Sequence, residues 1–172
     1  MTTERSDSEA NAAPTAAQAP VFQLQRVYLK DASLEMPHAP QIFLEHGSPQ
    51  IEVQLDVSHD GVVEGVIEVI VRVTATARVS DKVLFLVEAK QAGIFELRGI
   101  PEPQLAAVLG IVCPGIIYPY LRANVADLLT RTGLPPIHLA EINFEALYQQ
   151  KTGHSAPSPS GLIIPPSSQT RQ

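Results

Sequence analysis

The side chains best suited to bind a metal ion or to act as nucleophiles are five histidines and a single cysteine, Cys113. The histidines are dispersed, with no HExxH motif and no pair at the spacing of ligands on a helix. One cysteine alone forms neither an internal disulfide nor a structural zinc site. We therefore expect no bound metal, and we interpret Cys113 as a small buried apolar residue. The histidines are His38, His46, His59, His138 and His154.

Acidic residues and glycines do not form a catalytic or nucleotide-binding pattern either. Glu64 and Glu68 alternate on the polar face of an expected strand, where carboxylates more often give solubility than acid–base catalysis. The glycines at 93, 99 and 110 lack the spacing of a phosphate-binding loop. The sequence therefore predicts a protein that is not an enzyme, has no catalytic residue and uses no cofactor.

Length and charge narrow the class of protein further. The chain has 172 residues, enough for one globular domain, and a formal net charge of −6. Its few basic residues are scattered, so nucleic acid is not an expected partner. The first twenty residues lack the apolar core of a secretory signal, and no window approaches a membrane span. We expect a soluble, cytoplasmic protein with no direct membrane insertion.

Both ends of the chain differ in composition from the middle. Residues 1–20 are small, polar and alanine-rich, and residues 152–172 are rich in proline and serine, with one apolar island at 162–164. Such segments cannot bury enough apolar surface to fold, so we expect a disordered arm and a disordered tail. The folded domain is then expected at 21–151.

The stretch 103–131 contains only three charged side chains, Arg122, Asp127 and Arg131, which is too few for a solvated helix face. Apolar residues recur at helical spacing on both sides of the segment CPGIIYP, so we expect two helical segments with a break between them. One sheet cannot cover all of this apolar surface. The helix is either buried centrally in one domain or packs with its second face on another copy of the chain, and we favour the second arrangement.

Four segments alternate apolar and polar residues with the period of a strand, at 22–36, 51–57, 66–77 and 83–97. Short polar links, SHDG at 58–61 and VSDK at 79–82, predict turns after the second and third strands. A proline-rich crossing loop after the first strand carries the apolar residues Ile42, Phe43 and Leu44. Asn143 is positioned to cap a short amphipathic helix that presents Phe144, Leu147 and Tyr148 on one side.

One polar sheet face carries apolar residues among acids. Leu86 shares its face with Glu88, and Val27 and Leu29 are expected beside Asp31 and Glu35. Such a surface favours docking of a basic partner. Lone exposed aliphatic residues are also common without any function, and that alternative is slightly favoured by the pattern alone.

Several segments, taken together, resemble the bacterial protein-export chaperone family SecB. They are FQLQRVYLKDASLEMPHAP, VIEVIVRVTATA, FLVEAKQAGIFEL, CPGIIYPYLR and LPPIHLAEINFEALY, in this order, and they cover about residues 21 to 150. The resemblance implies an α+β fold: a four-stranded antiparallel sheet with a long broken helix and a short C-terminal helix packed on one face. It also implies a homotetramer, built as a dimer of dimers through the long helices, and no catalysis.

The same resemblance implies a holdase that binds unfolded secretory precursors through hydrophobic grooves and delivers them to the ATPase SecA. The basic, zinc-carrying tail of SecA would dock on the outer sheet face at Asp31, Glu35, Leu86 and Glu88, and the metal would belong to the partner. The groove is expected to contain Ile42, Phe43, Ile51, Val53, Leu55, Tyr118, Tyr120, Phe144, Leu147 and Tyr148.

Two features depart from the family pattern. Gly47 stands where the family often has a tryptophan, so one groove wall is less aromatic, and the tail is longer and not acidic. Two alternatives remain open. One is a general antiaggregation or toxin–antitoxin-linked chaperone of the same fold, which serves cytoplasmic clients. The other is a small-molecule carrier or an enzyme using the same groove, which the absence of converging polar groups disfavours.

Overall fold

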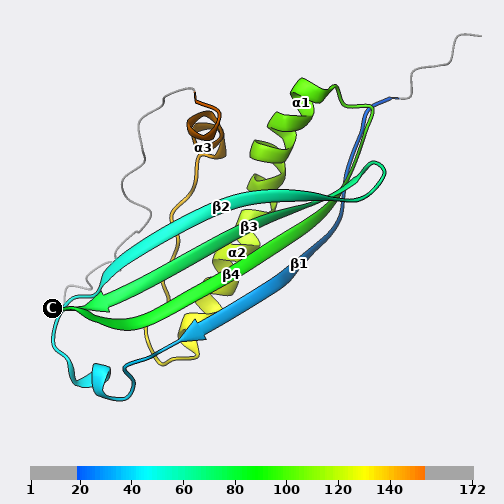
Figure 1. Ribbon diagram of the computed structural model, residues 1–172. Coiled ribbons are helices and arrows are strands. Elements are labelled where there is room, and N and C mark those ends of the chain that lie inside the picture. The colour runs from blue at the N-terminus through cyan, green and yellow to red at the C-terminus, as the bar shows by residue number, and fades with distance from the viewer. Residues whose placement is uncertain (1–18, 154–172) are drawn as a thin grey trace, which may run out of the picture.

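The computed structural model describes residues 19–153, so the predicted disorder at the two ends of the chain falls outside the described residues. The sheet has four strands: β1 Val21–Glu35, β2 Gln50–Val63, β3 Val66–Val79 and β4 Lys82–Arg98. All neighbours are antiparallel, and their order is β1-β4-β3-β2 (Figure 1). The crossing loop, which contains the 3-10 turn η1 Gln41–Leu44, carries the chain from β1 to the far edge.

The strands extend beyond the predicted segments at most of their ends. The predicted turn at SHDG is wrong, because Ser58, His59, Asp60 and Gly61 continue β2 and pair with β3. The chain turns instead at Gly65, whose positive φ of 73° is accessible to glycine at little cost. The inner face of β3 is apolar along its whole length, with Val69, Val71 and Val73 buried beneath the helices. The polar link therefore predicted the wrong position for the turn, while the apolar alternation was right.

β1 is irregular, and this changes which face some of its residues occupy. Its pairing with β4 shifts between Leu24 and Arg26 and again between Leu29 and Asp31. A shift of one residue moves every following side chain to the other face. Val27 therefore packs against the core and lies opposite Gly93, whereas Asp31 lies opposite Lys90 on the outer face. The expectation that Val27 and Leu29 share the face of the acids is wrong.

The long helix is continuous rather than broken at CPGIIYP. It consists of α1 Glu102–Ala107, a π-helical turn η2 Val108–Val112 and α2 Cys113–Thr130. In the π turn the Cys113 amide donates to the Val108 carbonyl, so the irregularity lies just before Pro114. Pro119 lies inside α2. Proline has no backbone N–H, so the carbonyl of Gly115 lacks its usual donor within the helix. Gly115 is exposed, and water can donate to this carbonyl instead.

Packing on the sheet holds this helix in spite of its prolines. A row of fully or nearly fully buried side chains at intervals of four residues faces the sheet: Leu109, Cys113, Ile117, Leu121, Val125 and Leu129. At Gly93 of β4 the helix comes so close that a Cβ atom would lie 2.7 Å from Cγ2 of Ile117. Burial raises the pKa of Cys113 to about 12, consistent with an inert apolar role.

The opposite side of the long helix remains apolar and largely uncovered. By length and composition Glu102–Thr130 could cross a membrane, so the expectation that no window approaches a span is wrong. Only a third of the residues in its most apolar stretch are buried within the single chain. Val112 and Tyr120 are about half exposed. A core helix of a soluble protein passes the same test, and here one side packs firmly on the sheet.

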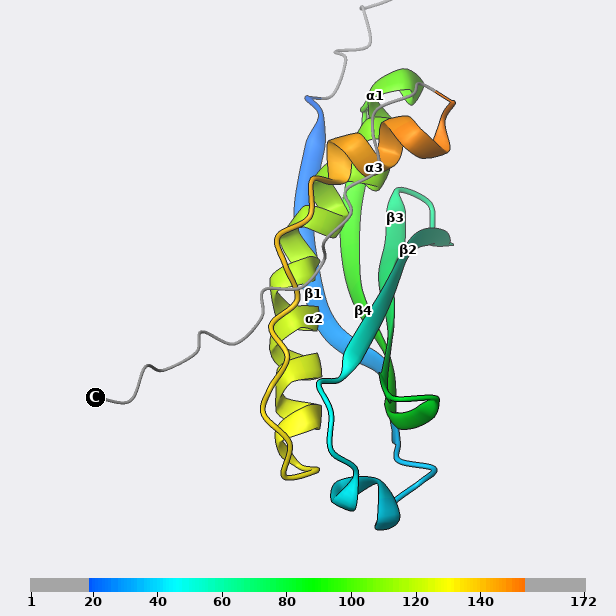
Figure 2. The same ribbon diagram turned by 90° about the vertical axis from the view of Figure 1, so that its left-hand side faces the viewer.

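The chain after α2 returns along the same side of the sheet to a short helix, α3 Phe144–Lys151 (Figures 1 and 2). The Asn143 side chain accepts a hydrogen bond from the Ala146 amide, as the predicted N-cap requires. Tyr118 donates to the Ala140 carbonyl at 2.7 Å and fixes the returning segment to α2. All helices lie on one face of the sheet, and the predicted α+β fold is confirmed.

Candidate functional site

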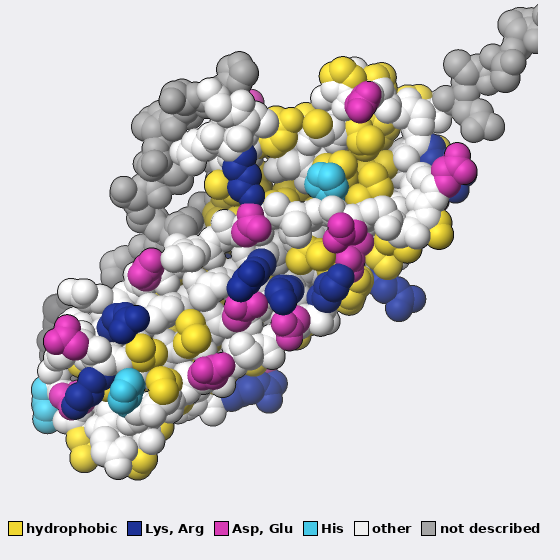
Figure 3. All heavy atoms as spheres, viewed as in Figure 1, with side chains coloured by type: hydrophobic (Ala, Val, Ile, Leu, Met, Phe, Trp, Pro, Cys, Tyr) yellow, Lys and Arg dark blue, Asp and Glu magenta, His cyan; other side chains and the backbone are white. Residues whose placement is uncertain are grey.

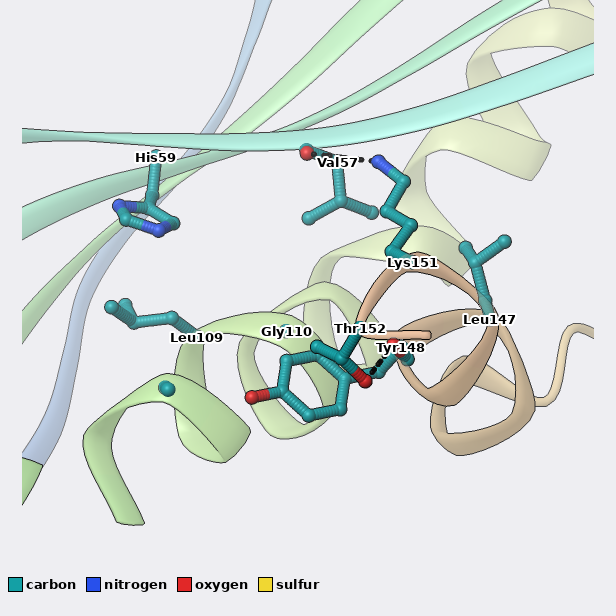
Figure 4. A pocket seen from close by; sticks show the side chains of 9 residues that line it. Val57, His59, Leu109, Gly110, Leu147, Tyr148, Lys151 and Thr152 are labelled. Carbon is teal, nitrogen blue, oxygen red and sulfur yellow. Dashed lines mark hydrogen bonds between the residues drawn. The ribbon is translucent and has the colours of Figure 1, made fainter. Parts of the chain in front are cut away.

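An apolar pocket lies where β2, the π turn and α3 meet (Figure 4). β2 supplies Val57 and His59, because the strand alternation that directs Ile51, Val53 and Leu55 inward continues through these positions. The pocket volume is about 200 Å³. An apolar cavity of about 150 Å³ holds a benzene-sized molecule, so this pocket has room for a branched aliphatic side chain. The other lining residues are Ala106, Leu109, Gly110, Leu147, Tyr148, Lys151 and Thr152.

α3 is seated on the long helix through a contact between Tyr148 and Gly110. A Cβ atom at position 110 would lie 2.8 Å from Cε2 and 3.3 Å from Cγ of the tyrosine ring. Only a residue without a side chain allows this approach. The ring forms the pocket floor beside the helix in Figure 4. Sequence reasoning assigned Tyr148 to the groove but missed Gly110, whose signal is a glycine inside an otherwise apolar helix.

A polar clamp closes the outer rim of the pocket. Lys151 forms an ion pair with Asp56 on the edge strand and donates a hydrogen bond to the Val57 carbonyl at 3.5 Å. The hydrogen bond from Lys151 lowers the pKa of Asp56 below its ordinary value, against the opposing effect of partial burial. Both charged side chains are about half exposed, so the ion pair positions α3 more than it stabilises the fold.

The predicted groove residues fall into three groups. Ile51, Val53 and Leu55 form a half-buried row on the inner face of β2 that leads to the pocket, where Leu147 and Tyr148 form part of the lining. Phe43 and Tyr120 are half exposed and lie away from the pocket lining.

The third group consists of Ile42, Tyr118 and Phe144, which are buried in the hydrophobic core. The Tyr118 and Phe144 rings meet edge to face, with centroids 5.5 Å apart. Burial raises the pKa of Tyr118 to about 12. These three side chains are therefore not free to touch a ligand in this arrangement of the chain.

The outer face brings the four predicted docking residues together. Glu35 lies directly opposite Leu86 across the β1–β4 pair, and Glu88 is two residues further along β4. Asp31 and Glu88 already have cationic partners within the chain: Lys90 contacts Asp31 at 3.1 Å, and Arg72 contacts Glu88 at 2.7 Å. Charges of both signs are accordingly interspersed over this face (Figure 3). The surface is therefore less acidic than the sequence pattern predicted.

The fold and the pocket together define a class of protein: a four-stranded antiparallel sheet with its helices on one face and an apolar pocket between the edge strand and those helices. A family model described as "Preprotein translocase subunit SecB" matches residues 15–155. The protein-export protein SecB of Bordetella avium is 55% identical, over 96% of this chain and 99% of that protein. The SecB protein of Methylibium petroleiphilum is 61% identical, over 76% of this chain and 80% of that protein. The chain belongs to the SecB family of protein-export chaperones.

A solved structure agrees with this assignment at the level of the fold. The Mycobacterium tuberculosis Rv1957 SecB-like chaperone, in complex with a ChAD peptide from the Rv1956 HigA1 antitoxin, gives a TM-score of 0.58. The match covers 70% of this chain and 90% of that chain, at 18% sequence identity. At this identity the likeness concerns the four-stranded sheet and its helices, and it carries no information about ligands.

Proposed function

We propose that this chaperone is a cytoplasmic holdase that binds unfolded secretory precursors and delivers them to the SecA ATPase. The observation that carries the proposal is the row of half-buried apolar side chains on the edge strand β2, which ends in the apolar pocket under α3. An unfolded chain presents alternating apolar side chains, and an aliphatic wall accepts many such segments with little sequence preference. Weak binding at several places then adds up to a stable complex.

Within the predicted groove, Ile51, Val53, Leu55, Leu147 and Tyr148 form the proposed contact surface. Phe43 and Tyr120 extend it for longer client segments. Ile42, Tyr118 and Phe144 maintain its shape from the core. The absence of a tryptophan near the crossing loop has a structural counterpart, because a Cβ atom at Gly47 would already lie 3.3 Å from Val79.

SecA is proposed to dock on the outer face at Asp31, Glu35, Leu86 and Glu88. A basic partner must there exchange the internal ion pairs of Asp31 and Glu88 for its own, so the docking contact is expected to weaken with added salt. Leu86 is half buried and supplies the apolar centre of the surface.

The proposed active form is a homotetramer, assembled as a dimer of dimers through the long helices. The uncovered apolar side of Glu102–Thr130 supports this assembly, because exposed apolar patches of such extent are uncommon on monomers. Light scattering at micromolar concentration should give four times the 18.6 kDa mass of one chain. A stable monomer would contradict the assembly.

Refolding of a slow-folding precursor tests the chaperone activity. The wild-type protein should retard refolding, and the Leu147→Ser variant should do so less while still binding SecA. The double variant Leu86→Ser with Glu88→Ala should show the opposite behaviour: normal retardation of refolding and weakened SecA binding. Refolding that is equally fast with and without the wild-type protein would refute the holdase. Loss of both activities in either variant would instead indicate misfolding.

A further inference from the structure

The pocket under α3 lies at the point where the described part of the chain ends. Lys151 and Thr152, the last residue of α3 and its C-cap, both line the pocket. Gly153 then adopts the left-handed conformation, with φ of +82°, and turns the chain off the helix axis at the pocket rim. Whatever follows Gly153 in sequence is therefore tethered next to an apolar cavity.

The sequence that follows contains one run with the chemistry of this cavity. Leu162, Ile163 and Ile164 are three consecutive branched aliphatic residues in a segment of prolines, serines and other small or polar residues. Eight residues separate Gly153 from Leu162, and an extended chain of that length reaches roughly 30 Å. Every part of the pocket is thus within reach of the run.

The residues on either side of the run would not hinder its entry into an apolar site. Between Gly153 and Thr170 the only ionisable side chain is His154, so the run can enter the pocket without burying a charge. Pro165 and Pro166 follow directly and lack backbone N–H groups, which reduces the number of donors that entry would desolvate. Three adjacent aliphatic residues left in water would instead be an aggregation hazard.

We infer that the pocket formed by β2, the π turn and α3 is an internal docking site for the Leu162–Ile164 run of the same chain. The tether gives the run an effective concentration of about millimolar, enough to half-fill a site that binds it only weakly. The run then competes with the outside ligands that this pocket accepts. This last step rests on the proposed chaperone function, whereas the docking itself does not.

Methyl NMR of the full-length protein tests the docking without any client. The triple variant Leu162→Ser, Ile163→Ser, Ile164→Ser should shift the methyl signals of Val57, Leu109 and Leu147. The core methyls of Leu121 should stay unchanged. The matched control, Pro157→Ser with Pro159→Ser, alters the segment but keeps the run, and should leave the pocket signals near their wild-type positions. Unchanged pocket methyls in the triple variant would overturn the inference.

Two further measurements locate the run and its consequence. A photo-crosslinker at position 163 in a mixture of isotope-labelled and unlabelled chains should give pocket crosslinks within one chain. Crosslinks that join two chains would overturn the intrachain site and assign the run to a second copy. Binding of a labelled unfolded polypeptide should tighten at least about twofold in the triple variant. Shifted methyls with unchanged client affinity would uphold the docking and instead contradict the use of this pocket by clients.

Discussion

Tyr148 packs its ring directly on the backbone of Gly110, and this contact positions α3 over the end of the apolar row on β2. The two residues come from helices that lie far apart in the sequence. The contact joins the π turn of the long helix to α3, and both elements line the pocket at this end of the groove. The position of α3 therefore depends on the absence of a side chain at Gly110.

Gly110→Ala should displace α3 while leaving the sheet intact. The added methyl would overlap the Tyr148 ring, and overpacking of this kind costs about 1 to 3 kcal/mol. Hydrogen exchange of the α3 amides should accelerate, and client affinity should change with it. Gly115→Ala is the matched control, because a Cβ atom there meets nothing within 4 Å. It should stabilise the helix by about 0.5 to 1 kcal/mol. Equal α3 exchange rates in the two variants would contradict this role of Gly110.

Gly93→Ala should destabilise the whole protein rather than α3 alone. A Cβ atom at this position would lie 2.7 Å from Ile117 and from the Phe95 ring, at the centre of the core. The helix would have to move away from β4, and we expect a loss of about 1 to 3 kcal/mol in the free energy of unfolding, measured by thermal or urea denaturation. Gly61→Ala, on the edge strand with nothing within 4 Å, provides the comparison. A melting temperature equal to that of Gly61→Ala would disprove the close packing.

The sheet was predictable because alternation along the strands is a local signal, and burial on one face reinforces it. The sheet face on which Val27 and Leu29 lie was not predictable, because the register shifts in β1 are not visible in the alternation of apolar and polar residues. The uninterrupted helix was missed for a related reason. Pro119 disfavours a helix locally, but the buried row through Ile117 and Leu121 outweighs that cost, and this packing is a property of the fold.

The candidate pocket was predictable only in part. Val57 already lay in the predicted strand at 51–57 but was not assigned to the groove, and the turn wrongly placed at 58–61 excluded His59. The contribution of Gly110 depends on a tertiary contact between two helices, which spacing along the chain does not encode.

Tyr118→Phe should loosen the segment that returns from α2 to α3. The hydroxyl donates to the Ala140 carbonyl at 2.7 Å, and its removal leaves a part-buried carbonyl without this donor, at a cost of about 1 kcal/mol. Hydrogen exchange in residues 134–143 should accelerate. Tyr120→Phe removes a hydroxyl from a residue that is about half exposed, and it should leave hydrogen exchange in residues 134–143 unchanged. If the two variants behaved alike, the hydrogen bond would have no role in fixing the segment.

The clamp between Lys151 and Asp56 predicts that α3 loosens at acidic pH. The hydrogen bond from Lys151 holds the pKa of Asp56 below its ordinary value of 3.8. A lowered pKa means that the ionised form favours the docked state, so this contribution is present above pH 3.8 and disappears as the pH falls further. Because both side chains are about half exposed, we expect it to be worth less than about 1 kcal/mol.

The methyl signals of Leu147 report on the docking of α3, and they should shift between pH 5 and pH 3 in the wild-type protein. Asp56→Asn removes the titrating group and should place these signals near their acidic positions already at pH 5. Lys151→Met removes the cation and should have the same effect, since Asp56 then loses the group that lowers its pKa. A pH dependence that persists unchanged in Asp56→Asn would show that another carboxylate controls α3, and the clamp would then have no part in closing the pocket.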